Sequence, residues 1–300
     1  MMNEKYNKDR EKPPCAAEWR RNPMGRQEPI GVFDSGVGGL TVAREIMRQI
    51  PNERIVYFGD TARVPYGNRS RETILEYARQ DVNFVKKHDV KMIIAACGTV
   101  SSAVGQAKDF GGGVPFTGVV IPAVQAACAA TRSGRIGVIG TAATIRSGAY
   151  GKAIRTIRQD AVIIGNACPL FVPLVENGIT DKDDIVVKTM VSRYLEPIKR
   201  ENVDTLILGC THYPLLRDAI AEYMGESVKL ISSGAEAAKY TMNMLAMNNM
   251  LSSRSENGHV TYFTSDSKML FESNAHAFIG SLNGSVEQIS IDDVIMQKDC

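Results

Sequence analysis

The sequence predicts an α/β protein whose parallel sheets are covered by helices, and three observations support this prediction. Short apolar runs alternate with longer amphipathic segments from residue 29 onward, which is typical of β-α units around a parallel sheet. The chain has 300 residues, enough for about two domains. Its 44% hydrophobic and 23% charged residues are ordinary for a globular protein. Two sheets fit this length, and we expect the functional loops at the carboxyl ends of their strands.

The expected elements follow from local patterns, taken in chain order. Short apolar runs next to turn residues predict strands at Ile30–Phe33, Ile55–Phe58, Met92–Ala96, Phe116–Val120, Ile136–Ile139, Ala161–Asn166, Thr205–Leu208, Lys229–Ser232 and Val260–Phe263. Apolar residues at helical spacing predict helices at Leu40–Gln49, Ser70–His88, Ser101–Asp109, Pro122–Thr131, Thr144–Arg158, Asp181–Arg200, Leu215–Met224 and Gly234–Asn248. Strands and helices therefore alternate along most of the chain.

Charge and hydropathy exclude an integral membrane protein and give no indication of a nucleic-acid partner. Thirty-five basic and 33 acidic residues give a net charge of +2, too small to indicate a nucleic-acid partner through bulk electrostatics. No window approaches the roughly 18 consecutive apolar residues of a membrane span. Residues 1–28 are rich in charge and lack the apolar core of a signal peptide, so we expect a disordered N-terminal extension.

The six cysteines divide into two groups. They are too few and too unevenly spaced for a disulfide framework or a zinc ribbon, so we expect free thiols in a reducing cytoplasm and no metal site. Cys97 and Cys210 each end a predicted strand and precede hydroxyl residues and a helix. A helix N-terminus favours thiolate over thiol. A single cysteine of this kind is more often a small buried hydrophobic residue, but two occurrences of the same arrangement favour a functional role. Each of two lobes would then supply one thiol to a shared cleft. The others are expected to be structural or incidental: Cys15, Cys128, Cys168 and Cys300.

Further polar residues stand at predicted strand ends. His212 follows Cys210 by two positions and can polarise that thiol or move protons near neutral pH, with a purely structural histidine as the alternative. Asp34 and Ser35 open a glycine-rich turn whose amides suit a carboxylate, and Asp34 itself suits a substrate ammonium or a thiol. Asp60 fits a helix cap as well as a ligand contact. Thr141, Thr144 and Glu176 offer hydroxyl or carboxylate groups at strand or helix ends, where caps are common.

Several blocks together resemble the cofactor-independent aspartate/glutamate racemase family. They are Gly31-Val-Phe-Asp34-Ser35-Gly36-Val-Gly-Gly-Leu, Tyr57-Phe-Gly-Asp60-Thr with Val-Pro65-Tyr66-Gly67, Ala96-Cys97-x-Thr99, Ile139-Gly-Thr141-x-x-Thr144-Ile and Leu208-Gly-Cys210-Thr211-His212-Tyr-Pro-Leu-Leu. The resemblance covers the chain from about Pro29 to near its end. It implies two flavodoxin-like α/β lobes, the second inserted in the first, with an active-site cleft between them. The first lobe would comprise residues 29–120 and about 233–300, and the second about 121–232.

The resemblance also implies a chemistry. The family interconverts L- and D-glutamate without pyridoxal phosphate or metal, and supplies D-glutamate for peptidoglycan synthesis in the cytoplasm, commonly as a homodimer. Removal of a proton from one face and delivery to the other needs two acid/base groups, here Cys97 and Cys210, with Asp34 and His212 as helpers. The substrate contacts implied are Asp34, Ser35, Tyr66, Gly67, Gly98, Thr99, Thr144, Thr211 and His212, with Asp60, Thr141 and Glu176 as auxiliary residues.

One position departs from the family pattern. Gly98 stands where the family usually has Asn, so a side-chain donor and acceptor are missing, and a water or a neighbour would fill the gap. This keeps a racemase for another amino acid, such as aspartate, as an alternative. Two other classes fit parts of the pattern: a hydrolase with Cys210 as nucleophile and His212 as base, which leaves Cys97 unused, and a protein that binds an amino acid without reacting.

Overall fold

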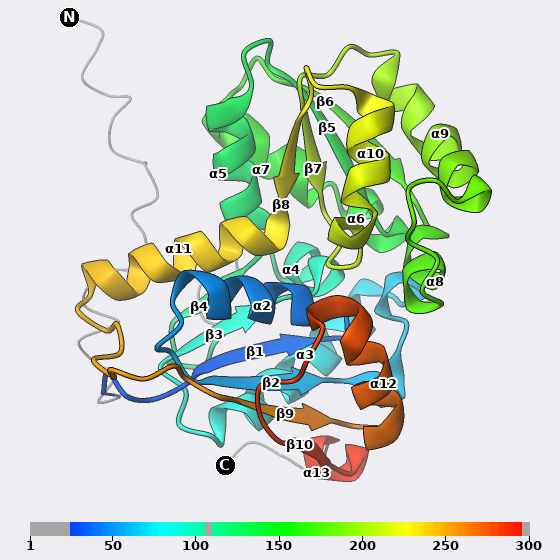
Figure 1. Ribbon diagram of the computed structural model, residues 1–300. Helices are drawn as coiled ribbons and strands as arrows, with labels where there is room; N and C mark the ends of the chain where they lie inside the picture. Colours follow the sequence, from blue (N-terminus) through cyan, green and yellow to red (C-terminus); the bar gives the residue numbers. More distant parts are fainter. Residues whose placement is uncertain (1–24, 106–109, 296–300) are drawn as a thin grey trace, which may run out of the picture.

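The computed structural model describes residues 25–105 and 110–295, and its strands form two sheets in which every recorded strand pair is parallel (Figure 1). The larger sheet has the order β10-β9-β2-β1-β3-β4, built from β1 (Ile30–Asp34), β2 (Ile55–Gly59), β3 (Met92–Ala95), β4 (Phe116–Gly118), β9 (Val260–Thr264) and β10 (Val286–Gln288). The smaller sheet has the order β6-β5-β7-β8, built from β5 (Arg135–Gly140), β6 (Val162–Ala167), β7 (Thr205–Leu208) and β8 (Lys229–Ser232). The α/β prediction with parallel sheets is confirmed.

Helices cover both faces of the larger sheet because successive side chains of each strand point to opposite faces. Ile30 and Val32 of β1 lie in one core and Phe33 in another. The first core includes α2 (Leu40–Gln49), α11 (Ser233–Met247) and α12 (Lys268–Ile279). The second includes α3 (Arg71–Lys86), α4 (Gly98–Val104) and α13 (Ile291–Ile295). We call this sheet with its helices the larger lobe.

The smaller sheet repeats this layering. Leu206 and Leu208 of β7 face one core and Ile207 the other. One face carries α5 (Val120–Ala130) and α7 (Ala149–Ile157), and the other carries α8 (Phe171–Glu176), α9 (Ile185–Lys199) and α10 (Arg217–Met224). The short α6 (Ala142–Ser147) follows β5. This sheet with its helices is the smaller lobe, drawn in green and yellow at the top of Figure 1.

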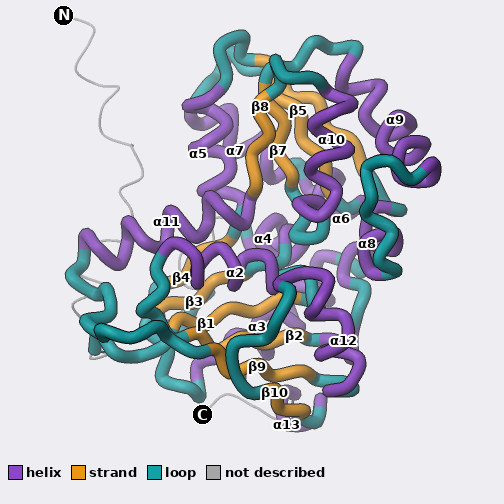
Figure 2. Tube along the Cα trace, viewed as in Figure 1, coloured by secondary structure: helices purple, strands orange, loops and turns teal. Residues whose placement is uncertain are grey.

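The chain crosses between the lobes twice. It leaves the larger sheet after β4 and enters α5, and it returns from β8 through α11. Helix α11 packs against both α2 and α5 and so contacts both lobes (Figure 2). The residue limits given above for the two lobes stay a prediction, and residues 1–24 of the expected extension lie outside the described residues.

Most predicted helices begin or end a few residues from their predicted limits, and two of these differences concern residues of interest. The helix after Cys97 begins at Gly98 rather than Ser101, so Cys97 is its N-cap. The expected helix Thr144–Arg158 is divided at Gly148, whose positive φ of 65° ends α6 and starts α7. No helix within 25–105 or 110–295 is both long and apolar enough to span a membrane.

Candidate active site

The carboxyl ends of four strands from the two lobes face each other. In the larger lobe β1 ends at Asp34, and Cys97 follows β3 by two residues. In the smaller lobe β5 is followed by Thr141, and Cys210 stands two residues after β7. Contacts between the lobes join these ends: Thr99 Oγ1 lies 2.9 Å from Thr141 Oγ1, and Thr41 Oγ1 donates to the Thr211 carbonyl at 2.9 Å. Both thiols therefore belong to one region between the sheets.

Cys97 is the N-cap of α4 and is only 6% exposed. Ser35 Oγ from the turn after β1 lies 3.5 Å from its sulfur. Burial and the nearby Asp34 carboxylate raise the pKa of the Cys97 thiol to about 12, against hydrogen bonds to Val100 and Ser35 that lower it. The expectation of a thiolate favoured by the helix N-terminus is wrong for Cys97. Desolvation outweighs the influence of a helix that spans seven residues, so burial favours the protonated thiol.

Asp34 is 1% exposed and keeps one oxygen available. Its Oδ2 accepts a hydrogen bond from the Gly36 amide at 3.2 Å, whereas no described residue donates to Oδ1. Burial raises the pKa of Asp34, and the charge of His212 together with the Gly36 and Gly39 amides lowers it. A buried acceptor without a donor is costly unless a ligand satisfies it. Oδ1 therefore suits a substrate ammonium.

On the smaller lobe, Cys210 begins a chain of three polar groups. Its sulfur lies 3.8 Å from His212 Nδ1, and His212 Nε2 lies 3.0 Å from Glu176 Oε1 at the end of α8. Cys210 and His212 are 6% and 7% exposed, whereas the Glu176 side chain is 43% exposed. The Glu176 carboxylate, on the solvent side, orients the His212 imidazole, and the opposite ring nitrogen faces the Cys210 sulfur. The arrangement can hold or pass a proton at Cys210.

Threonine hydroxyls line the same region. Thr141 is the N-cap of α6 and accepts from the Thr144 amide at 3.2 Å, and its hydroxyl also lies 3.0 Å from that of Thr144. The hydroxyl of Thr99 approaches Thr141 from the larger lobe, and a Cβ at Gly67 would lie 3.3 Å from Thr141. Thr141 is therefore a helix cap and a contact between lobes at once.

The chain matches the family model described as Asp/Glu/Hydantoin racemase over residues 30–241. It belongs to this racemase family. A glutamate racemase of Geobacter metallireducens is 45% identical over 263 residues, which is 88% of this chain and 97% of the relative. The crystal structure of a glutamate racemase isoform from Bacillus anthracis superposes with a TM-score of 0.84 at 39% identity, covering 89% and 98% of the two chains. That of the Francisella tularensis glutamate racemase in complex with D-glutamate gives 0.82 at 34% identity, covering 89% and 99%.

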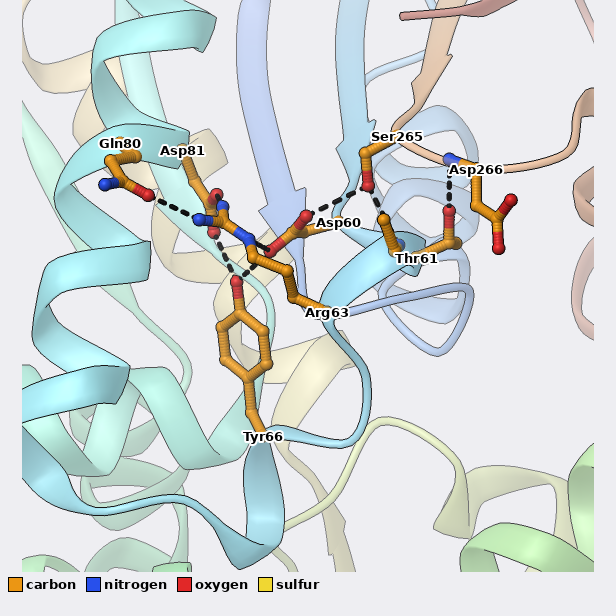
Figure 3. Close-up of polar contacts among 9 residues, drawn as sticks. Asp60, Thr61, Arg63, Tyr66, Gln80, Asp81, Ser265 and Asp266 are labelled. Carbon is orange, nitrogen blue, oxygen red and sulfur yellow. Dashed lines mark hydrogen bonds and ion pairs between the residues drawn. The ribbon is translucent and has the colours of Figure 1, made fainter. Parts of the chain in front are cut away.

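In this racemase-family member, one predicted substrate contact is held by larger-lobe carboxylates. The Tyr66 hydroxyl donates to Asp60 and, at 3.2 Å, to Asp81, and the Arg63 guanidinium joins both carboxylates (Figure 3). Asp60 occupies the N-cap position of the 3₁₀ turn Thr61–Arg63, as predicted, but its side chain makes no capping hydrogen bond. Its Oδ1 accepts a hydrogen bond from Ser265 Oγ at 2.9 Å. This buried network fixes the loop after β2. A substrate contact from Tyr66 or Asp60 stays a prediction.

Two contacts to the candidate site could not be predicted from the sequence. Thr41 lies on α2 and binds the backbone at Thr211, and the Phe278 ring on α12 meets the His212 imidazole edge-on at a centroid distance of 5.2 Å. Both lie inside helices, where periodicity indicates only a buried face. Nothing local in the sequence marks which buried side chain borders a site.

The pH dependence of folding reports on His212. Burial alone would lower the pKa of His212, but hydrogen bonds and charges from Cys210 and Glu176 raise it to about 10, from an ordinary 6.5. Because the folded pKa is the higher one, the stabilisation is complete below pH 6.5 and is lost as pH rises through about 10. We expect Glu176→Gln to lower the pKa of His212. The wild type should then have a higher free energy of unfolding than the variant, and this difference should be largest below pH 6.5.

Urea unfolding across this pH range measures that excess. Glu201→Gln is the matched control, because it removes an exposed carboxylate that is paired with Arg135 rather than with a histidine. A difference between wild type and Glu176→Gln that does not change with pH would contradict the assignment of the raised pKa to this pair.

Proposed function

We propose that the protein interconverts L- and D-glutamate by transferring protons between two thiols, without a cofactor, and that it supplies D-glutamate for peptidoglycan synthesis in the cytoplasm as a homodimer. The observation that carries this proposal is the pair of buried cysteines, one from each lobe, at facing strand ends. Each has its own polar partners: Ser35 and Asp34 beside Cys97, and His212 beside Cys210. The names of relatives at up to 45% identity support glutamate as the substrate.

In the proposed reaction, one sulfur accepts the α-proton while the other donates its proton to the opposite face. The C–H bond breaks as an S–H bond forms on one side, and the reverse occurs on the other. Because burial raises the pKa of Cys97, we assign this residue as the proton donor toward one enantiomer, with Cys210 accepting the α-proton from the opposite face. The roles exchange after each turnover.

The carbanion is the difficult intermediate, because no electron sink is invoked. Preorganised donors must offset the negative charge that develops on the carboxylate side. Three threonines can supply hydroxyl donors: Thr99, Thr144 and Thr211. These residues are only 4%, 1% and 5% exposed, so their hydroxyls act in a region largely free of water. Asp34 Oδ1 would bind the ammonium group, which is attached to the same α-carbon as the carboxylate.

A chiral assay tests the function directly. Incubation with L-glutamate and, separately, with D-glutamate is expected to reach the same racemic mixture, and aspartate is expected to react more slowly. Loss of α-deuterium from labelled glutamate separates racemisation from binding alone. Binding without deuterium loss or inversion would disprove the proposed reaction, and faster inversion of aspartate would change its substrate.

A further inference from the structure

The glycine that departs from the family pattern touches the other lobe. A Cβ built on Gly98 would lie 2.2 Å from the Gly209 carbonyl oxygen and 3.7 Å from the Cys210 Cα. The first distance is far below van der Waals contact. The space at position 98 is therefore not an open gap, because the Gly209 backbone already occupies it. We call this the glycine contact.

The Gly209 side of the glycine contact is held firmly. The Gly209 amide donates to the Ile139 carbonyl at 2.8 Å, which ties it to β5. A Cβ at Gly209 would itself lie 2.7 Å from that carbonyl oxygen and 3.1 Å from the Tyr150 ring. Because the obstructing atom is backbone, it cannot rotate away as a flexible side chain would.

The Gly98 side is equally held. Val100, Ala103 and Val104 of α4 are buried in the larger-lobe core. Close-packed cores resist small displacements. With the two backbones placed as they are in this chain, adding a side chain at position 98 would therefore move one lobe away from the other rather than shift a single residue.

Two further contacts between the lobes involve residues close in sequence to the glycine contact, since Thr99 follows Gly98 and Thr211 stands two residues after Gly209. Thr99 meets Thr141, and Thr41 meets the backbone of Thr211. Gly98 is covalently next to Cys97, and Gly209 is next to Cys210. The distance across the glycine contact therefore fixes the spacing of the two thiol-bearing backbones.

We propose that Gly98 is a positioning residue that sets the separation of Cys97 and Cys210 across the substrate. This inference rests on the two-thiol reaction proposed above. A displacement of about 1 Å in a reacting group can lower a rate by roughly 100-fold. A thiol held too far away still leaves the other thiol in place with the partners of its own lobe. Exchange at one face then continues while inversion fails.

The test is Gly98→Ala assayed in D2O, with two products measured together. Inversion gives the opposite enantiomer, and exchange with retention places deuterium in the starting enantiomer. We expect inversion to fall by about 100-fold and the ratio of retained exchange to inversion to rise at least tenfold. A smaller amount of folded enzyme would lower both rates and leave their ratio unchanged.

Gly165→Ala is the matched control, because a Cβ there meets only Ile145 side-chain atoms at 3.6 Å and beyond; its ratio is expected to equal that of the wild type. If Gly98→Ala does not fold, Thr41→Val carries the test by removing the contact to Thr211. It should shift the ratio in the same direction by a smaller factor. If folded Gly98→Ala shows the wild-type ratio of retained exchange to inversion, the inference is overturned. If Gly98→Ala does not fold, the same result in Thr41→Val overturns it.

A crystal structure of Gly98→Ala gives a second readout that needs no activity. The Cα atoms of Cys97 and Cys210 are expected to lie farther apart than in the wild type, and an unchanged separation would overturn the inference. If wild-type protein does not invert glutamate, the proposed function fails. The structural comparison still decides whether the glycine contact sets the spacing.

Discussion

Replacing either Cys97 or Cys210 with alanine is expected to lower the rate of glutamate inversion by at least about 1,000-fold, because each variant loses one of the two proton carriers. Each variant keeps one thiol with its neighbours, Ser35 beside Cys97 or His212 beside Cys210. We therefore expect each to exchange the α-hydrogen of only one enantiomer, and the two variants to prefer opposite enantiomers. Proton NMR in D2O follows both enantiomers separately.

Cys128→Ala is the control for this pair of variants. Cys128 is a free, buried thiol on α5 within the smaller-lobe core, so its loss tests for general effects of removing a sulfur. Activity close to that of the wild type is expected. Full interconversion in both directions by the Cys97 variant or by the Cys210 variant would rule out the two-thiol reaction.

Replacing Arg63 with methionine is expected to destabilise the fold by about 3–5 kcal/mol. The guanidinium bridges Asp60 and Asp81, and both carboxylates are completely buried. Burial and the charge of Asp60 already raise the pKa of Asp81 well above its ordinary value, and Arg63 opposes this. Without Arg63, the negative charges of these two buried carboxylates lose their positively charged partner. Urea unfolding near neutral pH measures the loss.

The same variant has a predictable pH dependence. Removal of Arg63 raises the pKa of Asp81 further, so the folded variant binds protons more readily than its unfolded chain, and its stability falls as pH rises above 3.8. The deficit relative to wild type should therefore shrink in acid. Arg69→Met, at an exposed position of the same loop, is expected to change stability by less than about 0.5 kcal/mol. Equal losses in the two variants would show that the buried network has no special role.

Much of the fold was predictable because most elements bury a regular pattern. Strands β7 and β8 have the predicted limits, and so does α2. The prediction omitted β10, a three-residue edge strand with only Val286 buried, and α12, where exposed Met269 and Leu270 blur the apolar stripe formed by Phe271, Ala275 and Phe278. Short edges and helices with mixed faces give weak periodicity.

The site was predictable where chemistry concentrates at strand ends. A parallel sheet places such residues at one edge, and this brings Asp34 beside Cys97. Partners that depend on the distance between the lobes were not predictable. The proximity of Gly98 to Gly209 and that of Thr41 to Thr211 reflect packing between segments more than 100 residues apart in sequence. The raised pKa of Cys97 likewise follows from burial, which no local motif reveals.

Helix α11 has a consequence for how the substrate reaches the thiols. It packs against α5, so the two places where the chain passes between lobes lie next to each other. If the lobes rotate relative to each other about these two adjacent links, they separate most on the side away from α11 and α5 (Figure 1). Helices α8 and α12 stand on that side, with the half-exposed Glu176 at the end of α8. Glutamate would thus arrive past the Glu176 carboxylate, and Glu176 and His212 would move together because both belong to the smaller lobe.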